Sequence, residues 1–384
     1  MRYRLEELFD LQMGKTPARA NLDYWNGTNK WVSISDLSSY DKYVTDTNEC
    51  ISDLGVSESG IKVVPKNTVI MSFKLSIGKT AITTEEVYTN EAIMAFIDKG
   101  ICEINTDYLY YLFSGTDWNK GTNKAVLGLT LNKATLSKKE IDIPDLHTQN
   151  EVVKKLDALS NVIQLQKHSL DKLDELIKSR FVEMFGDETN PQDLPVVNVE
   201  DVADVSVGVV IKPAQYYTDS AHGVKAFRSL NIGSMRIMDS DWVYFSQEGN
   251  ERNAKSQLKE NDLLVVRSGA PGTSCVVTKQ YEGCNAIDII IARPYIAQIN
   301  PYYLCTYTNM PHGKRQIVEG TSGAAQQHFN VGKYNKLRVM LPSIELQNRF
   351  VDIINQIDKS KLVVKKSIDK LETLKKSLMQ EYFG

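Results

Sequence analysis

Residues 143–186 read IPDLHTQNEVVKKLDALSNVIQLQKHSLDKLDELIKSRFVEMFG, and residues 341–384 read LPSIELQNRFVDIINQIDKSKLVVKKSIDKLETLKKSLMQEYFG. The two stretches align without a gap at a spacing of 198 residues. Their identical positions include Pro144/Pro342, Gln149/Gln347, Asn150/Asn348, Leu173/Leu371 and Phe185/Phe383. This spacing is too long for a solenoid repeat. It indicates two copies of a whole domain, each followed by the same segment.

Both repeated segments are expected to form long helices. No proline or glycine occurs within 146–185 or 344–383, and Asp145 and Ser343 stand where an N-cap is needed. Forty helical residues extend roughly 60 Å. Apolar residues recur at heptad spacing, and those expected to pack the helices together are Leu156, Leu159, Ile163, Leu170, Leu173, Ile354, Ile357, Val364, Ile368 and Leu371. Polar residues interrupt this stripe at Gln166, Arg180, Lys361 and Lys375. Because an imperfect heptad stripe favours one specific partner, we expect the two helices to pack on each other.

The segments before the helices also echo each other. Gly208 falls at the place of Gly14, and the segments 225–232, 285–292 and 299–307 echo 30–37, 90–97 and 104–112. The sequence therefore predicts an α+β protein with α/β domains at 1–142 and 197–340, helices at 143–186 and 341–384, and a polar linker at 187–196. In the first domain we expect helices at 5–11 and 104–115 and strands at 30–37, 67–78 and 90–97.

The overall composition is that of a globular protein. The chain has 384 residues, 42% of them hydrophobic and 24% charged, with a formal net charge of −3. Its five cysteines are odd in number and include no C-x-x-C pair, so neither a disulfide framework nor a zinc site is indicated. No apolar run reaches the length of a membrane span. We expect a cytoplasmic protein.

A search for catalytic motifs gives a negative result. The Gly-Lys-Thr triplets at 14–16 and 78–80 have Phe9 and Phe73 where a phosphate-binding loop requires its first glycine. The five histidines lie far apart and lack the spacing of metal ligands. We therefore predict no catalytic residue, no metal site and no cofactor bound by this chain.

Two segments favour nucleic-acid binding. The first basic segment, residues 118–139, carries five lysines and no acid, and the second basic segment, residues 312–338, carries five cations and one acid. The first carries Asn and Thr, and the second carries Thr, Ser, Gln, His and Asn. These side chains can contact base edges while Lys and Arg hold phosphates. A glycine-containing turn after a strand, at 72–80 and again at 266–274, adds further cations. The alternative interpretations are a solvated basic face and plain hairpin turns.

The candidate DNA contacts come from these segments and turns, with one further arginine at 228. They are Lys74, Lys79, Thr80, Lys124, Thr130, Asn132, Lys133, Arg228, Arg267, Ser268, Thr273, Gln326, Gln327, His328, Asn330 and Lys333.

Taken in order along the whole chain, these features resemble the specificity subunits of Type I restriction–modification systems. The resemblance is carried by the two segments 143–186 and 341–384, by the turn NDLLVVRSGAPG, and by Asn90-Ala92-Ile93 and Asn285-Ala286-Ile287. It implies two target recognition domains that each read one half of a bipartite sequence in double-stranded DNA. It also implies that the long helices pack antiparallel as a coiled-coil spacer.

The resemblance further implies a subunit without catalysis of its own. Two modification subunits would bind it and use S-adenosylmethionine to methylate adenine N6, and restriction subunits would add ATP- and Mg-dependent chemistry. Three alternatives stay open: a coiled-coil adaptor that binds only proteins, the specificity subunit of a fused restriction–methylase, and a self-sufficient methyltransferase or nuclease.

Overall fold

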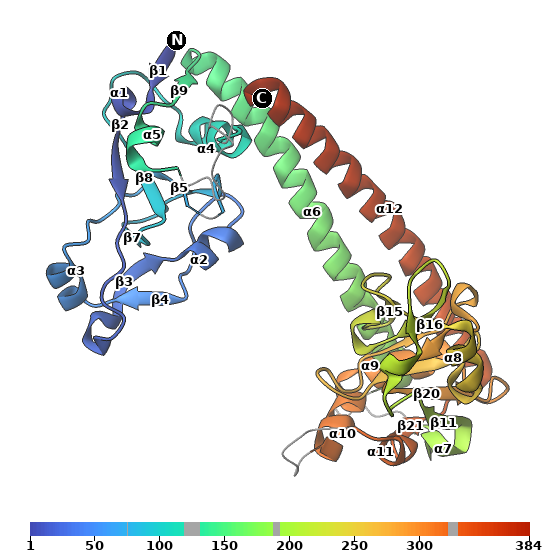
Figure 1. Cartoon of the computed structure of the whole chain (residues 1–384). Coiled ribbons are helices and arrows are strands. Elements are labelled where there is room, and N and C mark those ends of the chain that lie inside the picture. Colours follow the sequence, from blue (N-terminus) through green and yellow to red (C-terminus); the bar gives the residue numbers. More distant parts are fainter. Residues whose placement is uncertain (75, 119–130, 187–192, 322–328) are drawn as a thin grey trace. The chain divides into compact units, whose positions relative to one another are not determined.

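The computed structural model describes residues 1–74, 76–118, 131–186, 193–321 and 329–384 (Figure 1). The chain divides into two compact units. The first unit contains Met1–Lys167 together with Lys365–Gly384, and the second contains His168–Val364. Each long helix thus contributes to both units, a division that the sequence repeat alone does not indicate.

The first unit contains short strands and helices around one four-stranded sheet. Its elements are β1 (Arg2–Arg4), α1 (Leu5–Leu8), β2 (Phe9–Met13), η1 (Leu22–Tyr24), β3 (Trp25–Val32), α2 (Ile34–Ser39), β4 (Glu49–Ile51), α3 (Asp53–Ser59), β5 (Val69–Ser72), β6 (Thr80–Ile82), β7 (Tyr88–Thr89), β8 (Ile93–Asp98), α4 (Thr106–Gly115), α5 (Lys133–Ser137) and β9 (Glu140–Asp142). The strand order is β2-β8-β5-β6, with antiparallel neighbours throughout. Every residue of β5 and β6 is buried, and the rings of Phe9, Phe96 and Phe113 meet edge to face in the core below.

The second unit repeats this topology. Its elements are β10 (Val196–Asn198), α7 (Val199–Val202), β11 (Ala203–Val207), η2 (Pro213–Tyr216), β12 (Tyr217–Thr218), β13 (Gly223–Phe227), η3 (Ser229–Asn231), β14 (Ile232–Gly233), β15 (Arg236–Ile237), β16 (Val243–Ser246), α8 (Gln247–Arg252), η4 (Ala254–Ser256), β17 (Leu263–Val266), β18 (Ser274–Val276), η5 (Lys279–Tyr281), β19 (Asn285–Ala286), β20 (Ile289–Pro294), α9 (Pro301–Asn309), α10 (Pro311–Thr321), α11 (Val331–Asn335) and β21 (Arg338–Met340). The order β11-β20-β17-β18 matches that of the first sheet, again with antiparallel neighbours. Part of the predicted linker, 187–192, lies outside the described residues, and Val196 already begins β10.

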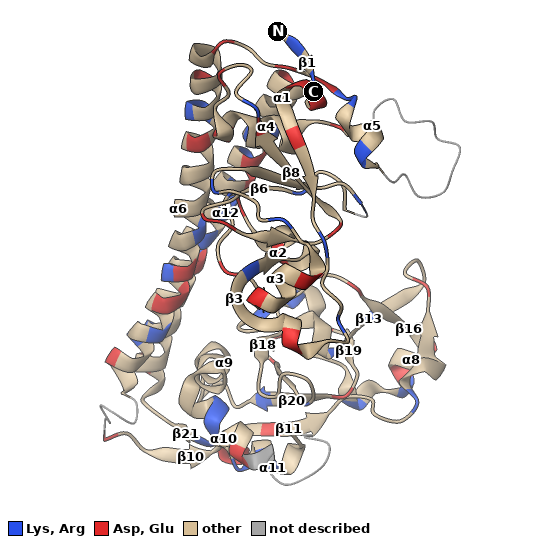
Figure 2. Cartoon of the chain, turned by 90° about the vertical axis from the view of Figure 1, so that its left-hand side faces the viewer, with Lys and Arg blue, Asp and Glu red and all other residues tan. Residues whose placement is uncertain are grey.

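The two long helices are confirmed as predicted. α6 (Leu146–Phe185) and α12 (Ile344–Phe383) each run 40 residues. The predicted caps close their first turns, because Asp145 accepts from the amide of Thr148 (2.8 Å) and Ser343 accepts from that of Leu346 (3.3 Å). Both acidic and basic residues occur along α6 (Figure 2).

Cross-helix contacts show that α6 and α12 pack antiparallel, so the predicted fold class is confirmed. In the first unit, Gln166 Nε2 donates to Ser367 Oγ (2.9 Å) while Lys155 Nζ reaches the Tyr382 hydroxyl (3.5 Å). In the second unit, Lys361 Nζ pairs with Asp174 (2.5 Å). Of the predicted packing residues, Leu156, Ile163, Ile354, Ile357 and Ile368 are buried, and Leu159, Leu170, Leu173, Val364 and Leu371 are half-buried. Gln166 and Lys361, which interrupt the stripe, are thus used for polar contacts across the pair.

The last turn of each long helix packs on the helix that follows the main sheet. In the first unit, the ring of Phe383 lies 5.6 Å from that of Tyr108 on α4. In the second unit, Phe185 of α6 lies 4.9 Å from Tyr303 on α9. The first domain is therefore completed by the helix of the second repeat, and the second domain by the helix of the first repeat.

Three local predictions are wrong. The segment 67–78 is a strand only over Val69–Ser72, after which the chain turns towards β6. The segment 5–11 is helical only to Leu8, because Phe9 and Leu11 alternate with exposed Asp10 and pair with β8 as a strand. The segment 30–37 is a strand only to Val32. Ser33 then forms a capping box with Asp36, which starts α2.

The similarity between Asn90-Ala92-Ile93 and Asn285-Ala286-Ile287 is also not a structural equivalence. Thr89 lies opposite Val32 in one unit, and Ala286 lies opposite Phe227 in the other. Asn285 therefore occupies the place of Tyr88, not of Asn90. The connection between the two strands is one residue longer in the first unit, which shifts the alignment.

Candidate nucleic-acid interface

One edge of each main sheet collects loops from distant parts of the sequence. In the first unit, β2 and β5 end at this edge, while β8 and β6 begin there. In the second unit, β11, β17, β20 and β18 have the same arrangement. Because neighbouring strands are antiparallel, the loops after β2 and β11 lie at the same edge as the two glycine turns. We call this edge of each sheet the loop edge.

The loops after β2 and β11 are fixed to the loop edge in the same way in both units. Gly14 N donates to Ile93 O (3.1 Å), and Gly208 N donates to Ile289 O (2.9 Å). A Cβ atom on Gly14 would lie 2.2 Å from the carbonyl oxygen of Thr89, so no other residue fits without a shift of the backbone. The repeated glycine is thus required for close approach.

In the second unit, the glycine turn and the second basic segment are directly bonded. Phe329 N donates to Arg267 O (3.1 Å), and Arg267 Nε donates to Phe329 O (3.2 Å). The Arg267 guanidinium also pairs with Asp288, and only 16% of its side chain is exposed. Arg267 therefore holds the loop edge together, a role within the protein that the sequence did not reveal.

In the first unit, the glycine turn packs on the start of the first basic segment. A Cβ atom on Gly78 would lie 3.3 Å from Cδ1 of Trp118, and Trp118 Nε1 donates to Phe113 O (2.9 Å). Phe73 and Leu131, from the turn and the segment, belong to the same hydrophobic cluster. The structure thus brings together, in both units, the two regions predicted to bind DNA.

The individual candidates differ in how much of each side chain is accessible. Those with exposed side chains are Lys79, Asn132, Lys133, Asn330 and Lys333, and those half-buried are Lys74, Arg228, Arg267, Ser268 and Thr273. Thr80 is buried and donates to Gly78 O (3.0 Å), so its hydroxyl has a partner inside the turn. Arg228 directly follows β13, a strand of a second four-stranded sheet with the order β12-β16-β13-β19, and donates to the carbonyl of Asp241. Lys124, Thr130, Gln326, Gln327 and His328 lie outside the described residues.

Two of the exposed candidates also have a structural role. Asn132 accepts from the amide of Thr135 (2.8 Å) and caps α5, and Asn330 accepts from the amide of Lys333 (2.9 Å) and caps α11. A side chain engaged as an N-cap is a weaker candidate for reading a base than a free amide. The exposed lysines remain the stronger candidates on this face.

The sequence did not draw attention to the loops after β2 and β11. In the second unit this loop exposes Val210, Ile211 and Lys212. In the first unit it carries Lys15, which donates to the carbonyl of Ser59, and Arg19, which pairs with Glu49 and stacks 3.9 Å over Trp25. The sequence signal that could have identified these two loops was their position directly after the repeated glycine.

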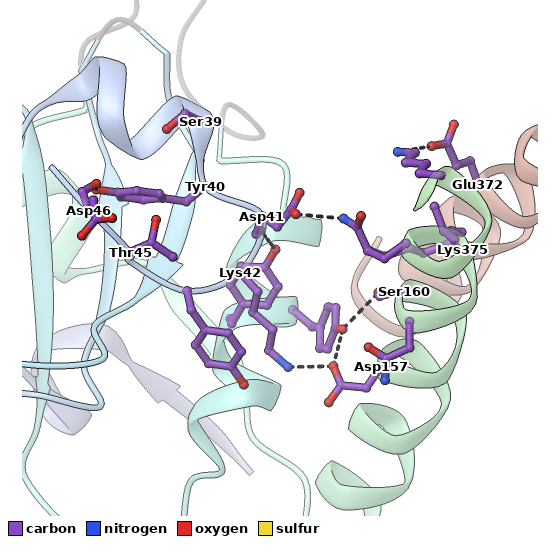
Figure 3. A pocket seen from close by; sticks show the side chains of 17 residues that line it. Ser39, Tyr40, Asp41, Lys42, Thr45, Asp46, Asp157, Ser160, Glu372 and Lys375 are labelled. Atoms are coloured by element: carbon purple, nitrogen blue, oxygen red, sulfur yellow. Dashed lines mark hydrogen bonds and ion pairs between the residues drawn. The ribbon is translucent and has the colours of Figure 1, made fainter. Parts of the chain in front are cut away.

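A charged cluster fixes the loop 39–46 of the first unit to α6 (Figure 3). Lys42 Nζ lies 2.7 Å from Asp157 and 2.9 Å from Asp107, and the Tyr111 hydroxyl donates to Asp157 (2.5 Å). Burial tends to lower the pKa of Lys42, but its hydrogen bonds to the two carboxylates raise the pKa above the usual 10.5. The cluster borders a cleft of about 740 Å³, with Lys375 of α12 on its far wall.

Within the part of the chain that the structure describes, no helix has the length and apolarity needed to cross a membrane.

Comparison with known proteins gives one consistent family. Residues 1–175 match the family described as the Type I restriction modification DNA specificity domain. The chain is 20% identical to the MjaIX specificity subunit of Methanocaldococcus jannaschii, over 98% of this chain and 90% of that protein. It is 22% identical to the EcoprrI specificity subunit of Escherichia coli, over 92% of this chain and 86% of that protein.

Solved structures show the same fold. A chain from a study of complex assembly and conformational transition of the type I R-M system superposes with a TM-score of 0.64 at 16% identity, over 100% of this chain and 97% of that one. The S subunit of a Type I restriction–modification system from M. genitalium superposes with a TM-score of 0.50 at 13% identity, over 100% and 96%.

Proposed function

The chain belongs to the specificity subunits of Type I restriction–modification systems, which are the DNA-recognition components of those systems, and on this basis we propose that each of its two domains reads one half of a bipartite target. The loop edge of each main sheet would face the DNA. The observation that carries this proposal is the meeting, in both units, of the glycine turn with the basic segment.

The charge of the chain fits a subunit that shares the DNA with partners. Its net charge is −3, whereas a protein that alone neutralises many phosphates is basic. The exposed lysines of the loop edges supply a few phosphate contacts, and bound partner subunits would supply the rest. The exposed polar side chains beside them would contribute base contacts.

The proposed partners are two modification subunits, and restriction subunits in the complete complex. Apolar residues are exposed at equivalent positions of the two long helices, namely Leu165/Val363 and Leu176/Leu374. A pair of similar surfaces suits two copies of one partner. We propose that these partners bind S-adenosylmethionine and methylate adenine N6, that ATP and Mg serve the restriction subunits, and that the assembly acts on DNA in the cytoplasm.

The decisive experiment is a base-resolution map of N6-methyladenine in cells that express this chain with its modification subunit. We expect a bipartite motif with a fixed gap that disappears when the chain is deleted. If the partner is folded and bound but no new methylation appears, the adaptor hypothesis gains support. If the motif does appear, purification of the active complex would show whether the partner is one fused restriction–methylase or a set of separate modification and restriction subunits.

A further inference from the structure

The loop after β11 ends in an exposed apolar tip. Ile211 is 78% exposed and the adjacent Val210 is 50% exposed. Single exposed apolar residues are common on protein surfaces. Two adjacent β-branched residues exposed at the tip of one loop, directly before the exposed Lys212, need a separate explanation.

This tip is held in a fixed position. Val209 N donates to Ala286 O (2.8 Å), and Asp288 N donates to Val209 O (3.2 Å). Asp288 in turn pairs with Arg267. Lys212 has a φ of 43°, a left-handed conformation that a lysine adopts only when its surroundings impose it. The two apolar residues are therefore presented on a rigid base.

The surroundings of the tip suit an anionic partner. Lys212 follows directly and is exposed, and the second basic segment at the same loop edge exposes Lys333. Asp288, the carboxylate at the base of the loop, is paired with Arg267. A small apolar tip followed directly by an exposed lysine matches the side chains with which some proteins part neighbouring base pairs.

We propose that Val210 and Ile211 form an apolar wedge that inserts between base pairs in the half-site read by the second domain, with Lys212 contacting the adjacent phosphate. This inference rests on the proposed function. The wedge would be a property of the second domain alone. At the positions equivalent to Val210 and Ile211, the first unit has Thr16, which is half-buried, and Pro17, which is buried. Its Lys15 and Arg19 are engaged with Ser59 and Glu49.

The test uses the complex of the full chain with its modification subunit, on duplexes of the mapped target that carry 2-aminopurine at successive steps. We expect wild type to raise 2-aminopurine fluorescence at one step of the second half-site. Ile211→Ala should abolish this rise and weaken DNA binding about tenfold, a loss comparable to one base-pair mismatch. Ile211→Leu should retain both.

Ile296→Ala is the matched control. Ile296 lies in the same unit beyond the other end of β20, away from the loop edge, and is 59% exposed. Its replacement should leave affinity and fluorescence unchanged. Both alanine variants should unfold at the wild-type temperature, because each side chain is exposed.

The outcomes separate the wedge from the proposed function. If the wild-type complex shows no sequence-specific binding, the proposed function fails. If wild type binds its target but Ile211→Ala matches it in affinity and fluorescence, the wedge is overturned while the function stands. If Ile211→Ala instead weakens assembly with the modification subunit, the tip is a protein interface and the wedge is again overturned.

Discussion

Gln149 and Gln347, at the start of the two long helices, make the same set of hydrogen bonds in their separate units. Each is fully buried, and each accepts through Oε1 from the backbone amide that begins the neighbouring helix, 2.8 Å away at Asn105 and at Asn300. Each Nε2 donates to two carbonyls, those of Glu103 and Pro144 in the first unit and those of Gln298 and Pro342 in the second. One amide side chain thus ties the long helix to the sheet-covering helix in each domain.

Replacing Gln347 by Leu should destabilise the second unit. The substitution leaves the buried amide of Asn300 and two carbonyls without their partner, and such a loss costs about 2–4 kcal/mol. Urea unfolding monitored by hydrogen exchange in α9 would measure it. Gln356→Leu, at an exposed site on the same helix, is the control and should change stability little. Equal stability of the two variants would contradict the structural role of Gln347.

Replacing Lys42 by Met should loosen the loop 39–46 of the first unit. Asp107 and Asp157 would lose their shared cation, at a cost of about 1–3 kcal/mol after allowance for their partial exposure. Because the folded pKa of Lys42 lies above 10.5, this contribution is present below pH 10.5 and is lost as the pH rises through the folded pKa.

Unfolding of the first unit across an alkaline pH series is the appropriate measurement. Wild type should lose more stability than Lys42→Met above pH 10.5. Lys154→Met, exposed on α6, should follow wild type. If the stability of wild type and of Lys42→Met falls in parallel as the pH rises, the ion pairs of Lys42 contribute nothing to the stability of the first unit.

The charge of Lys375 should affect the stability of the first unit in the opposite sense to the charge of Lys42. It is half-buried, its ammonium lies 5.9 Å from the ring centre of Tyr111, and no ion pair to it is found among the described residues. Burial lowers the pKa of Lys375, so the charged form opposes folding at neutral pH and this penalty disappears as the pH rises through the lowered pKa.

Lys375→Met should therefore stabilise the first unit by about 0.5–1 kcal/mol at neutral pH, given its partial exposure. Thermal unfolding would measure the gain, with the exposed neighbour Lys376→Met as control. A destabilised Lys375→Met variant would mean that the cation has a favourable role in the isolated chain.

Lys133→Ala should weaken DNA binding by the assembled complex without changing the target. Lys133 is exposed at the start of α5, and loss of one phosphate contact should lower the slope of log affinity against log salt by about 1. Salt titrations of binding to the mapped target test this, with Lys154→Ala as control. An unchanged slope would remove Lys133 from the interface.

The long helices could be predicted because their signals are local and strong. The absence of Pro and Gly, the caps Asp145 and Ser343 and the heptad stripe all gave their bounds correctly. The similarity of Asn90 to Asn285 misled because it rested on letters, whereas the equivalence is set by strand pairing with β3 and β13. A one-residue difference in a turn carries no sequence signal of its own.

The candidate site could be predicted only in part, for a related reason. Basic segments and glycine turns are visible in the sequence, but their meeting depends on a hydrogen bond between residues 62 positions apart, Arg267 and Phe329. The tip at Ile211 was missed because exposure of an apolar residue is decided by tertiary packing. The sequence predicted a DNA contact at Arg267, and its pairing with Asp288 is a further role that only the structure shows.

The sharing of the long helices affects how the protein is made. The second unit is continuous in sequence, but the first requires residues 365–384, where Phe383 packs on Tyr108. A ribosome adding about 5–20 residues per second takes roughly 10–40 s to make the intervening 200 or so residues. Throughout that interval the domain translated first waits for its last helix with an apolar surface uncovered. Newly made chains should therefore need chaperones most while the second domain is being translated.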